Sequence, residues 1–421
     1  MREACSYVFL YKHTFVYISL FLIFYLIQFQ SSWIGLRISG VRGRTDFIDQ
    51  QSILNSAECF ERFGMDIYKV SSIGNPCDGF MYSIHLLQLI NFTHLSNLGA
   101  NQISIILMCL VLSLLSSTFF FLRKAGLVEN TTALIALISP GIWLLMERGN
   151  YDEFIFVCVF ISAMLLQSRF KELGVLMIGV TVLLKFYTLP LFILSLILLS
   201  RKNSKIFFGL CIVPLTTYTY YLIDKVAYFP FERSFSFGLQ FIGLYLQGFK
   251  VRVLGDAARL SDLQLLSIGL FYFVLIFALL YFFKVLNFED TNLAIFDSRA
   301  GYIYFGNSVV FLSCYFAGMN YDYRLIFLSV LVALAPSVLS GSRFRSILVV
   351  SGLGALLFNT FSYGLSGHLR WLMELSGDFA LSIFVPLQLS FLTKLLFTTA
   401  RASSQSRTPS GDFRIPRSPL D

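Results

Sequence analysis

Long apolar runs separated by short polar or basic segments make up most of this 421-residue chain. Many of these runs approach the roughly 20 residues that a helix needs to cross a bilayer. The first covers residues 14–36 without a charge, and the last covers 380–396. The pattern predicts an all-α, polytopic membrane protein with about ten full transmembrane helices.

Basic residues between the runs predict how the chain is oriented. Short cytoplasmic loops carry an excess of Lys and Arg, and such residues recur here at 123–124, 169–171, 201–202 and 343–345. With these segments inside, both termini are cytoplasmic, and two long loops, at about 37–101 and 223–262, are external. We therefore expect one transmembrane domain over residues 1–400 and a disordered cytoplasmic tail over 401–421.

The segment 173–200 differs from the other apolar runs because basic clusters precede and follow it. If both clusters are cytoplasmic, the segment returns to the side from which it entered. Pro190 favours a break in the helix, so we predict a re-entrant hairpin of two half-length helices, broken near residues 185–190. Such a turn is tolerated only where protein or a water-filled cavity surrounds it. That places Lys185 beside a cavity.

Composition agrees with the membrane prediction. The chain is 56% hydrophobic and only 13% charged, about half the charged fraction of a soluble domain, which is roughly 25%. We attribute the net charge of +8 to membrane orientation and expect no nucleic-acid partner. The histidines are isolated and show no metal spacing, so neither metal nor cofactor is expected. Cys59 and Cys77 share the first external loop, where a disulfide could form.

Polar chemistry concentrates on the predicted external side. Carboxylates crowd the first loop, and the polar clusters ERGNYDE (147–153), NYDYR (320–324) and SGHLRWLMELSGD (366–378) lie between apolar runs. The first two clusters share the tripeptide Asn-Tyr-Asp. This recurrence is either a coincidence in a Tyr-rich chain or the sign that both clusters cap one site from opposite sides. An ionisable residue at membrane depth, such as Lys185, is by default a functional-site candidate.

Several of these segments together resemble a known family. The loop RTDF…FGMDIYKV, the cluster E-R-G-N-x-D and the segment LLKFYTLPLFI resemble glycosyltransferases of the GT-C fold, and within them the polyprenyl-phosphate-mannose-dependent group. The resemblance covers residues 14–200, and NYDYRLIFL adds to it. Two stretches depart from the family pattern: 64–68 matches its Gly-Asp-x-Tyr only loosely, and 77–82 replaces its Tyr-Pro-Pro.

The resemblance implies an inverting, metal-independent hexosyltransferase in the plasma (inner) membrane, with its active site facing the periplasm or exterior. Its donor would be a polyprenyl-phosphate-linked sugar, with mannose as the first candidate, and its acceptor a lipid or glycan. Asp46 matches the family's Asp-Phe pair and is the candidate base. Asp49 lies on the same face of a helical turn and is the alternative base or a partner that tunes the first.

Cationic and polar residues complete the predicted site. The candidates for the lipid phosphate are Arg148 and Lys185, with Arg324 as a further one. Asn150, Asp152 and Asp322 would hold the sugar or orient Arg148.

Simpler interpretations and other functions stay open. Asp46 could be a solvated loop carboxylate, Arg148 could pair with Glu147 or Asp152, and Lys185 could extend to the interface if the hairpin is shallow. A lipid or sugar transporter or flippase would also use broken helices and buried charges. An O-antigen polymerase or ligase would share the many spans and large external loops.

Overall fold

The computed structural model describes most of the apolar part of the chain. The described residues are 48–63, 84–122, 125–199, 262–286, 298–316, 320–321, 324–339, 342–361 and 367–405, with isolated positions at 16, 17, 19, 204, 206, 208–210, 236–237 and 296.

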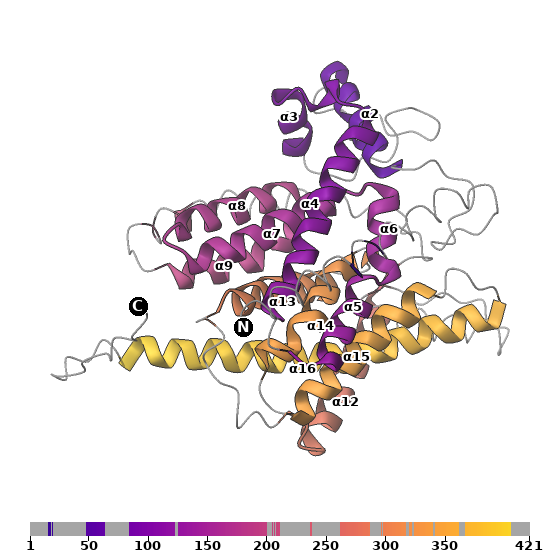
Figure 1. Cartoon of the computed structure of the whole chain (residues 1–421), viewed down its shortest axis with the longest axis vertical. Helices are drawn as coiled ribbons and strands as arrows, with labels where there is room; N and C mark the ends of the chain where they lie inside the picture. The colour runs from indigo at the N-terminus through magenta and orange to yellow at the C-terminus, as the bar shows by residue number, and fades with distance from the viewer. Residues whose placement is uncertain are drawn as a thin grey trace, which may run out of the picture.

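Helices account for almost all of the described structure (Figure 1). The α-helices are α2 (Ile48–Phe63), α3 (Ile84–Phe92), α4 (Ala100–Phe121), α5 (Leu127–Leu137), α6 (Pro140–Arg148), α7 (Asp152–Gln167), α8 (Lys171–Leu184), α9 (Leu189–Leu198), α12 (Asp262–Phe282), α13 (Arg299–Phe316), α14 (Leu325–Val338), α15 (Ser342–Phe361) and α16 (Gly367–Gln405). Two 3-10 turns, η2 (Leu95–Asn97) and η3 (Phe186–Thr188), accompany them. The strands β1 (Ser236–Phe237) and β2 (Asn320–Tyr321) form one short antiparallel pair. The predicted all-α class is therefore confirmed.

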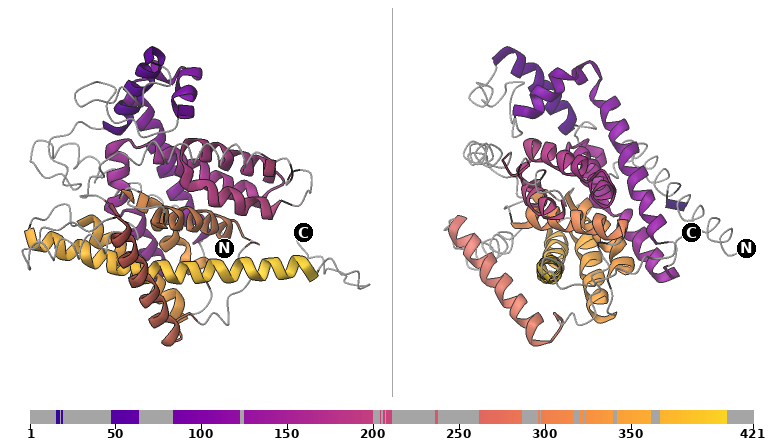
Figure 2. Two further views of the ribbon diagram at one scale, coloured as in Figure 1. Left: turned by 180° about the vertical axis from the view of Figure 1, so that it is seen from behind. Right: turned by 90° about the vertical axis from the view of Figure 1, so that its left-hand side faces the viewer.

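The core is centred on α13 and α14. Every residue of α14 from Leu325 to Ala335 is buried, as expected for a helix that is apolar on all sides. Phe156 of α7 packs against Phe327 of α14, with ring centroids 5.9 Å apart. The pair α2–α3 stands at one end of the molecule, beyond the first turns of α4, in both orientations of the ribbon (Figures 1 and 2).

Three helical segments among the described residues are long and apolar enough to cross a membrane: Ala100–Phe121, Leu127–Met146 and Leu372–Thr398. Shorter apolar helices occur at Leu189–Leu198, Ser267–Phe282 and Leu325–Val338. These segments agree with a membrane protein. The total of about ten spans stays a prediction, and the first predicted span, 14–36, lies almost wholly outside the described residues.

The hairpin predicted within 173–200 breaks within the predicted interval. Helix α8 ends at Leu184, and Lys185 adopts an extended backbone conformation, with φ −147° and ψ 122°. The turn η3 follows, and α9 begins with Pro190 in its first turn, where the missing N–H of proline costs no hydrogen bond. The two helices pack closely, because a Cβ added at Gly179 would lie 3.2 Å from the ring of Phe192.

Two further predictions can be compared with the structure. The predicted tail began at residue 401, but α16 continues to Gln405. No helix-breaking residue interrupts 401–405, and the next proline is at position 409, so the helix can continue past residue 401. Residues 406–421 lie outside the described residues. Cys59 is disulfide-bonded. Its partner lies outside the described residues, because the other described cysteines, Cys109, Cys158 and Cys314, form no disulfide.

Candidate active site

Asp49 and Arg148 form a bidentate ion pair between α2 and α6. Arg148 donates from Nη2 to Oδ1 of Asp49 at 2.6 Å and from Nε to Oδ2 at 2.9 Å. Asp49 lies in the first turn of its helix and Arg148 is the last residue of its own, so each charge also complements a helix dipole. The paired geometry fixes the guanidinium plane as well as its position.

Asn150 joins this ion pair to a second group of charges. The chain reverses at Gly149, which ends α6 with φ 57° and ψ 46°, a left-handed conformation that glycine adopts without strain. The reversal lets Asn150 donate from Nδ2 to Oδ2 of Asp49 at 2.6 Å. Its Oδ1 accepts the backbone N–H of Asp152 at 2.9 Å and a longer hydrogen bond, 3.5 Å, from Nζ of Lys185. Both ends of the amide are therefore engaged.

Asp152 is the centre of the second group. Its Oδ1 accepts from Nζ of Lys185 and from the hydroxyl of Tyr187, both at 2.5 Å, and its Oδ2 accepts from Nε of Arg324 at 3.1 Å. Lys185 and Tyr187 come from the hairpin break, whereas Arg324 immediately precedes α14. The guanidinium of Arg324 also lies over the Tyr187 ring, 5.1 Å from its centroid. The break at η3 is therefore what brings the hairpin's polar groups to Asp152.

This network is buried but reaches the protein surface through its cations. Asp152 is fully enclosed, whereas the side chains of Lys185, Arg148 and Arg324 are 9%, 15% and 16% exposed. Burial alone would raise the pKa of the Asp152 carboxyl, but Lys185 and Arg324 outweigh that effect and hold the pKa at about 2. Asp152 is therefore ionised at neutral pH and keeps both cations in place.

The structure brings together every predicted site residue that it describes. Six of them, Asp49, Arg148, Asn150, Asp152, Lys185 and Arg324, belong to one continuous hydrogen-bonded network. The remaining two, Asp46 and Asp322, lie outside the described residues.

The two Asn-Tyr-Asp clusters meet through the Asp152–Arg324 pair. In addition, β1 places residues 236–237 of the second long loop beside residues 320–321. Three segments predicted to be external are thus next to one another.

Two residues of the site were not predicted from the sequence. Tyr187 was overlooked because tyrosine is abundant in this chain, although a hydroxyl two residues after Lys185 in an apolar hairpin was an available signal. Glu153 follows Asp152 and is fully buried, and neither of its carboxyl oxygens has a hydrogen-bond partner among the described residues. Among the described residues, no cluster of His, Cys, Asp and Glu has the arrangement of a metal site.

Comparison with known proteins identifies no family for this chain. No family model matches the chain, and no curated protein or solved structure is significantly similar to it. The charge network and the resemblance of the motifs are therefore the two grounds for assigning a function.

Proposed function

We propose that this protein is a membrane glycosyltransferase that moves a hexose, with mannose as the first candidate, from a polyprenyl-phosphate donor to a lipid or glycan acceptor. The observation that supports it is the network of Arg148, Lys185 and Arg324 around two carboxylates, the partly buried Asp49 and the fully buried Asp152. Such buried ion pairs contribute little net stability. They do, however, fix cations before a ligand arrives, which is what stabilisation of a developing phosphate charge requires.

The three cations suit the leaving group of this reaction. Arg148 and Arg324 have planar guanidinium groups that match phosphate oxygens, and Lys185 adds a compact charge. Each cation is partly exposed at the edge of the network, so a phosphate could reach them without dismantling it. Asn150 and Asp152 would orient these cations and the sugar, and Asp322 is assigned to the same role from the sequence.

The geometry favours Asp46 over Asp49 as the base. The carboxylate of Asp49 accepts three N–H donors, two from Arg148 and one from Asn150. Both oxygens of Asp49 are therefore engaged, and these contacts would have to be broken or shared before it could take a proton from the acceptor. We therefore assign Asp49 to positioning Arg148 and leave proton abstraction to Asp46, three residues earlier in the chain.

The reaction would proceed by inversion. The acceptor hydroxyl oxygen forms a bond to C1 of the sugar while the bond from C1 to the phosphate oxygen breaks. The lipid phosphate leaves with that electron pair and meets the cations, and the hydroxyl proton passes to Asp46. We further propose about ten transmembrane helices in the plasma (inner) membrane, cytoplasmic termini and a site facing the exterior, in agreement with the basic residues of the short loops.

A transfer assay with purified protein tests the proposal. The protein would be incubated in lipid nanodiscs with radiolabelled polyprenyl-phosphate mannose, glucose or galactose and a membrane lipid extract. We expect sugar transfer that is lost in Asp46→Asn and falls about 100-fold or more in Lys185→Met, as for the loss of one electrostatic contact to a transition state. Intact donor after prolonged incubation with every sugar would contradict the proposal.

A transporter is the second candidate, because the structure contains a broken helix with a buried cation at Lys185. Transporter folds use such breaks to bind ions and anionic substrates. Movement of an intact labelled lipid-phosphate sugar across proteoliposome membranes, without transfer of the sugar, would favour this function over the transferase.

A further inference from the structure

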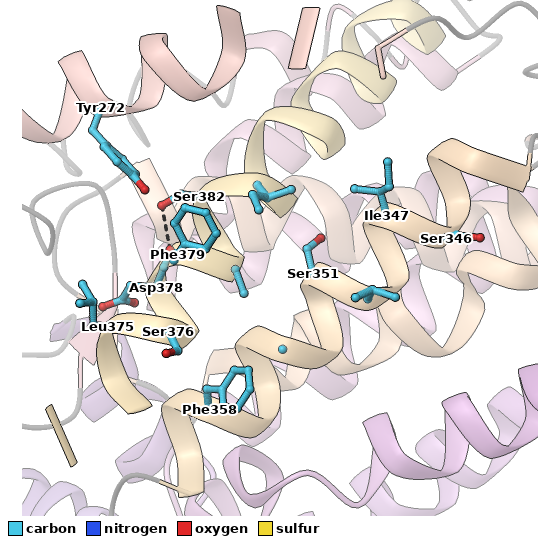
Figure 3. A pocket seen from close by; sticks show the side chains of 14 residues that line it. Tyr272, Ser346, Ile347, Ser351, Phe358, Leu375, Ser376, Asp378, Phe379 and Ser382 are labelled. Carbon is cyan, nitrogen blue, oxygen red and sulfur yellow. Dashed lines mark hydrogen bonds between the residues drawn. The ribbon is translucent and has the colours of Figure 1, made fainter. Parts of the chain in front are cut away.

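An apolar cavity lies between α12, α15 and α16, and its lining includes none of the residues assigned so far (Figure 3). Its volume is about 850 Å³, within the range of pockets that enclose small ligands. Its walls are mainly aliphatic and aromatic, with Ile347, Val350, Phe358 and Ile383 among them. Such a lining matches a hydrocarbon chain.

The cavity has a polar end where three helices meet. Ser382 of α16 hydrogen-bonds with the hydroxyls of Tyr272 from α12 and Tyr315 from α13. In Figure 3 the hydroxyls of Tyr272 and Ser382 lie next to each other at this end. Asp378 lies one turn before Ser382 on α16 and also lines the cavity, although its side chain is almost completely buried. A polar group on a ligand would find hydrogen-bond partners at this end, whereas the rest of the lining suits an apolar chain.

The cavity is open at the protein surface. Val350 and Phe379 both line it, and they are 68% and 51% exposed. Large exposed apolar side chains are expected where a membrane protein faces lipid. A lipid can therefore enter from the side without passing through water.

The last turn of α13 separates this polar end from the charge network. Cys314 interacts electrostatically with Asp152, Lys185 and Arg324. The next residue, Tyr315, interacts with Asp378 and with Tyr272. Consecutive residues of α13 therefore interact with the charge network and with the polar end of the cavity.

We infer that this cavity binds a lipid alcohol, with the hydrocarbon chain along the apolar walls and the hydroxyl at Asp378, Ser382 and Tyr272. None of the described residues that line the cavity is Lys, Arg or His, which disfavours a phosphate head group. A carboxyl oxygen can accept a hydrogen bond from a ligand hydroxyl in either protonation state, and a hydroxyl costs less to desolvate than an ammonium or a phosphate group.

Resting on the proposed function, this inference makes the lipid alcohol the acceptor. The nucleophilic oxygen must then reach C1 of the donor sugar, so the cavity and the donor site would have to meet beyond the last turn of α13. Cys314 and Tyr315 then mark the boundary between the acceptor and donor sites.

Photolabelling of the full chain in nanodiscs tests the inference. The probes are three diazirine-bearing molecules with the same long chain and different head groups: an alcohol, a primary amine and a phosphate monoester. We expect saturable labelling of α12, α15 or α16 by the alcohol, and at least about tenfold weaker binding of the two charged probes because their heads must be desolvated. Equal or tighter binding of the amine would overturn the alcohol assignment.

Three variants locate the binding. Val350→Trp fills the cavity from an exposed position and should reduce alcohol labelling about tenfold, whereas Leu372→Trp, on an exposed part of α16 outside the cavity, should not. Asp378→Leu should weaken the alcohol about tenfold through the lost hydrogen bond. Melting temperatures close to that of the wild type would exclude misfolding. Labelling that Val350→Trp leaves unchanged would refute the site.

The outcome is separable from that of the proposed function. Sugar transfer that is insensitive to Val350→Trp would leave the transferase standing and remove the acceptor site. Specific alcohol binding without transfer of any sugar would support the lipid-alcohol site and contradict the proposed transferase function.

Discussion

Arg148 and Asp49 are 99 residues apart in the chain, yet the guanidinium of one donates two parallel hydrogen bonds to the carboxylate of the other. This pair attaches α2, which stands at one end of the molecule, to the end of α6. It connects the first long loop to the helical core, and through Asn150 it reaches Asp152.

Breaking this pair from either side should destabilise the protein. Asp49→Asn leaves the Arg148 guanidinium largely buried without its counter-charge, and we expect a loss of about 3 kcal/mol in the free energy of unfolding. Arg148→Lys keeps the charge but cannot form the bidentate contact and should lose less. The melting temperature of the purified protein in detergent measures both effects.

The pair Arg370–Glu374 is a matched control. It joins residues one turn apart on α16 and is more exposed, at 32% and 23% for the two side chains. Arg370→Lys should therefore cost less than about 1 kcal/mol. If Arg370→Lys and Asp49→Asn lowered the melting temperature equally, the Asp49–Arg148 pair would have no special structural role.

Asp152 should stabilise the fold uniformly across the neutral pH range. Its pKa is lowered from 3.8 to about 2 in the folded protein, so the unfolded chain takes up the proton first as the pH falls. The contribution of Asp152 is then fully present above about pH 4 and disappears as the pH approaches 2. We expect Asp152→Asn to lower the melting temperature by the same amount at pH 6 and pH 8. A difference that changes over this interval would show that Asp152 is not held ionised.

Most residues of the site could be predicted from the sequence, but not which of them pair with one another. Lys185 and Pro190 indicated a broken helix because a lone charge and a proline are both unfavourable within an apolar span. The flanking residues in the sequence do not indicate which carboxylate each cation pairs with. Asp49, predicted as an alternative base or a partner that tunes Asp46, binds Arg148, and this contact depends on the packing of α2 against α6. Tyr187 and Glu153 acquire significance only from their three-dimensional neighbours.

Replacing Glu153 should stabilise the protein. Its carboxyl is fully buried and neither oxygen has a hydrogen-bond partner in the described part of the chain, a situation that costs about 1–3 kcal/mol for a polar group. Glu153→Leu removes this penalty and should raise the melting temperature, while Glu58→Gln, at an exposed position of the described part of α2, should change little. A marked fall in Glu153→Leu would mean that the carboxyl has a structural role that its described surroundings do not reveal.

Tyr187 should contribute through its hydroxyl and its ring separately. Tyr187→Phe removes the hydrogen bond to Asp152 but keeps the ring beneath Arg324, and should cost about 1–2 kcal/mol. Tyr187→Leu also removes the cation–π contact and should cost roughly 1 kcal/mol more. Under the proposed function, both variants should raise the KM for the donor, since Arg324 loses its fixed orientation. Equal KM values for wild type and Tyr187→Leu would show that this tyrosine does not position the cation.

Close packing in the core makes Gly352 difficult to replace. A Cβ at this position of α15 would overlap the Val332 side chain of α14 and lie 3.1 Å from the Phe384 ring of α16. Alanine normally stabilises a helix interior by about 1 kcal/mol relative to glycine, but here we expect Gly352→Ala to lower stability by about 1–3 kcal/mol through overpacking. At Gly209 a Cβ would have no neighbour within 4 Å, so Gly209→Ala should be neutral or stabilising. Melting curves of the two variants side by side test the contrast, and a stabilised Gly352→Ala protein would mean that the three helices are farther apart than described.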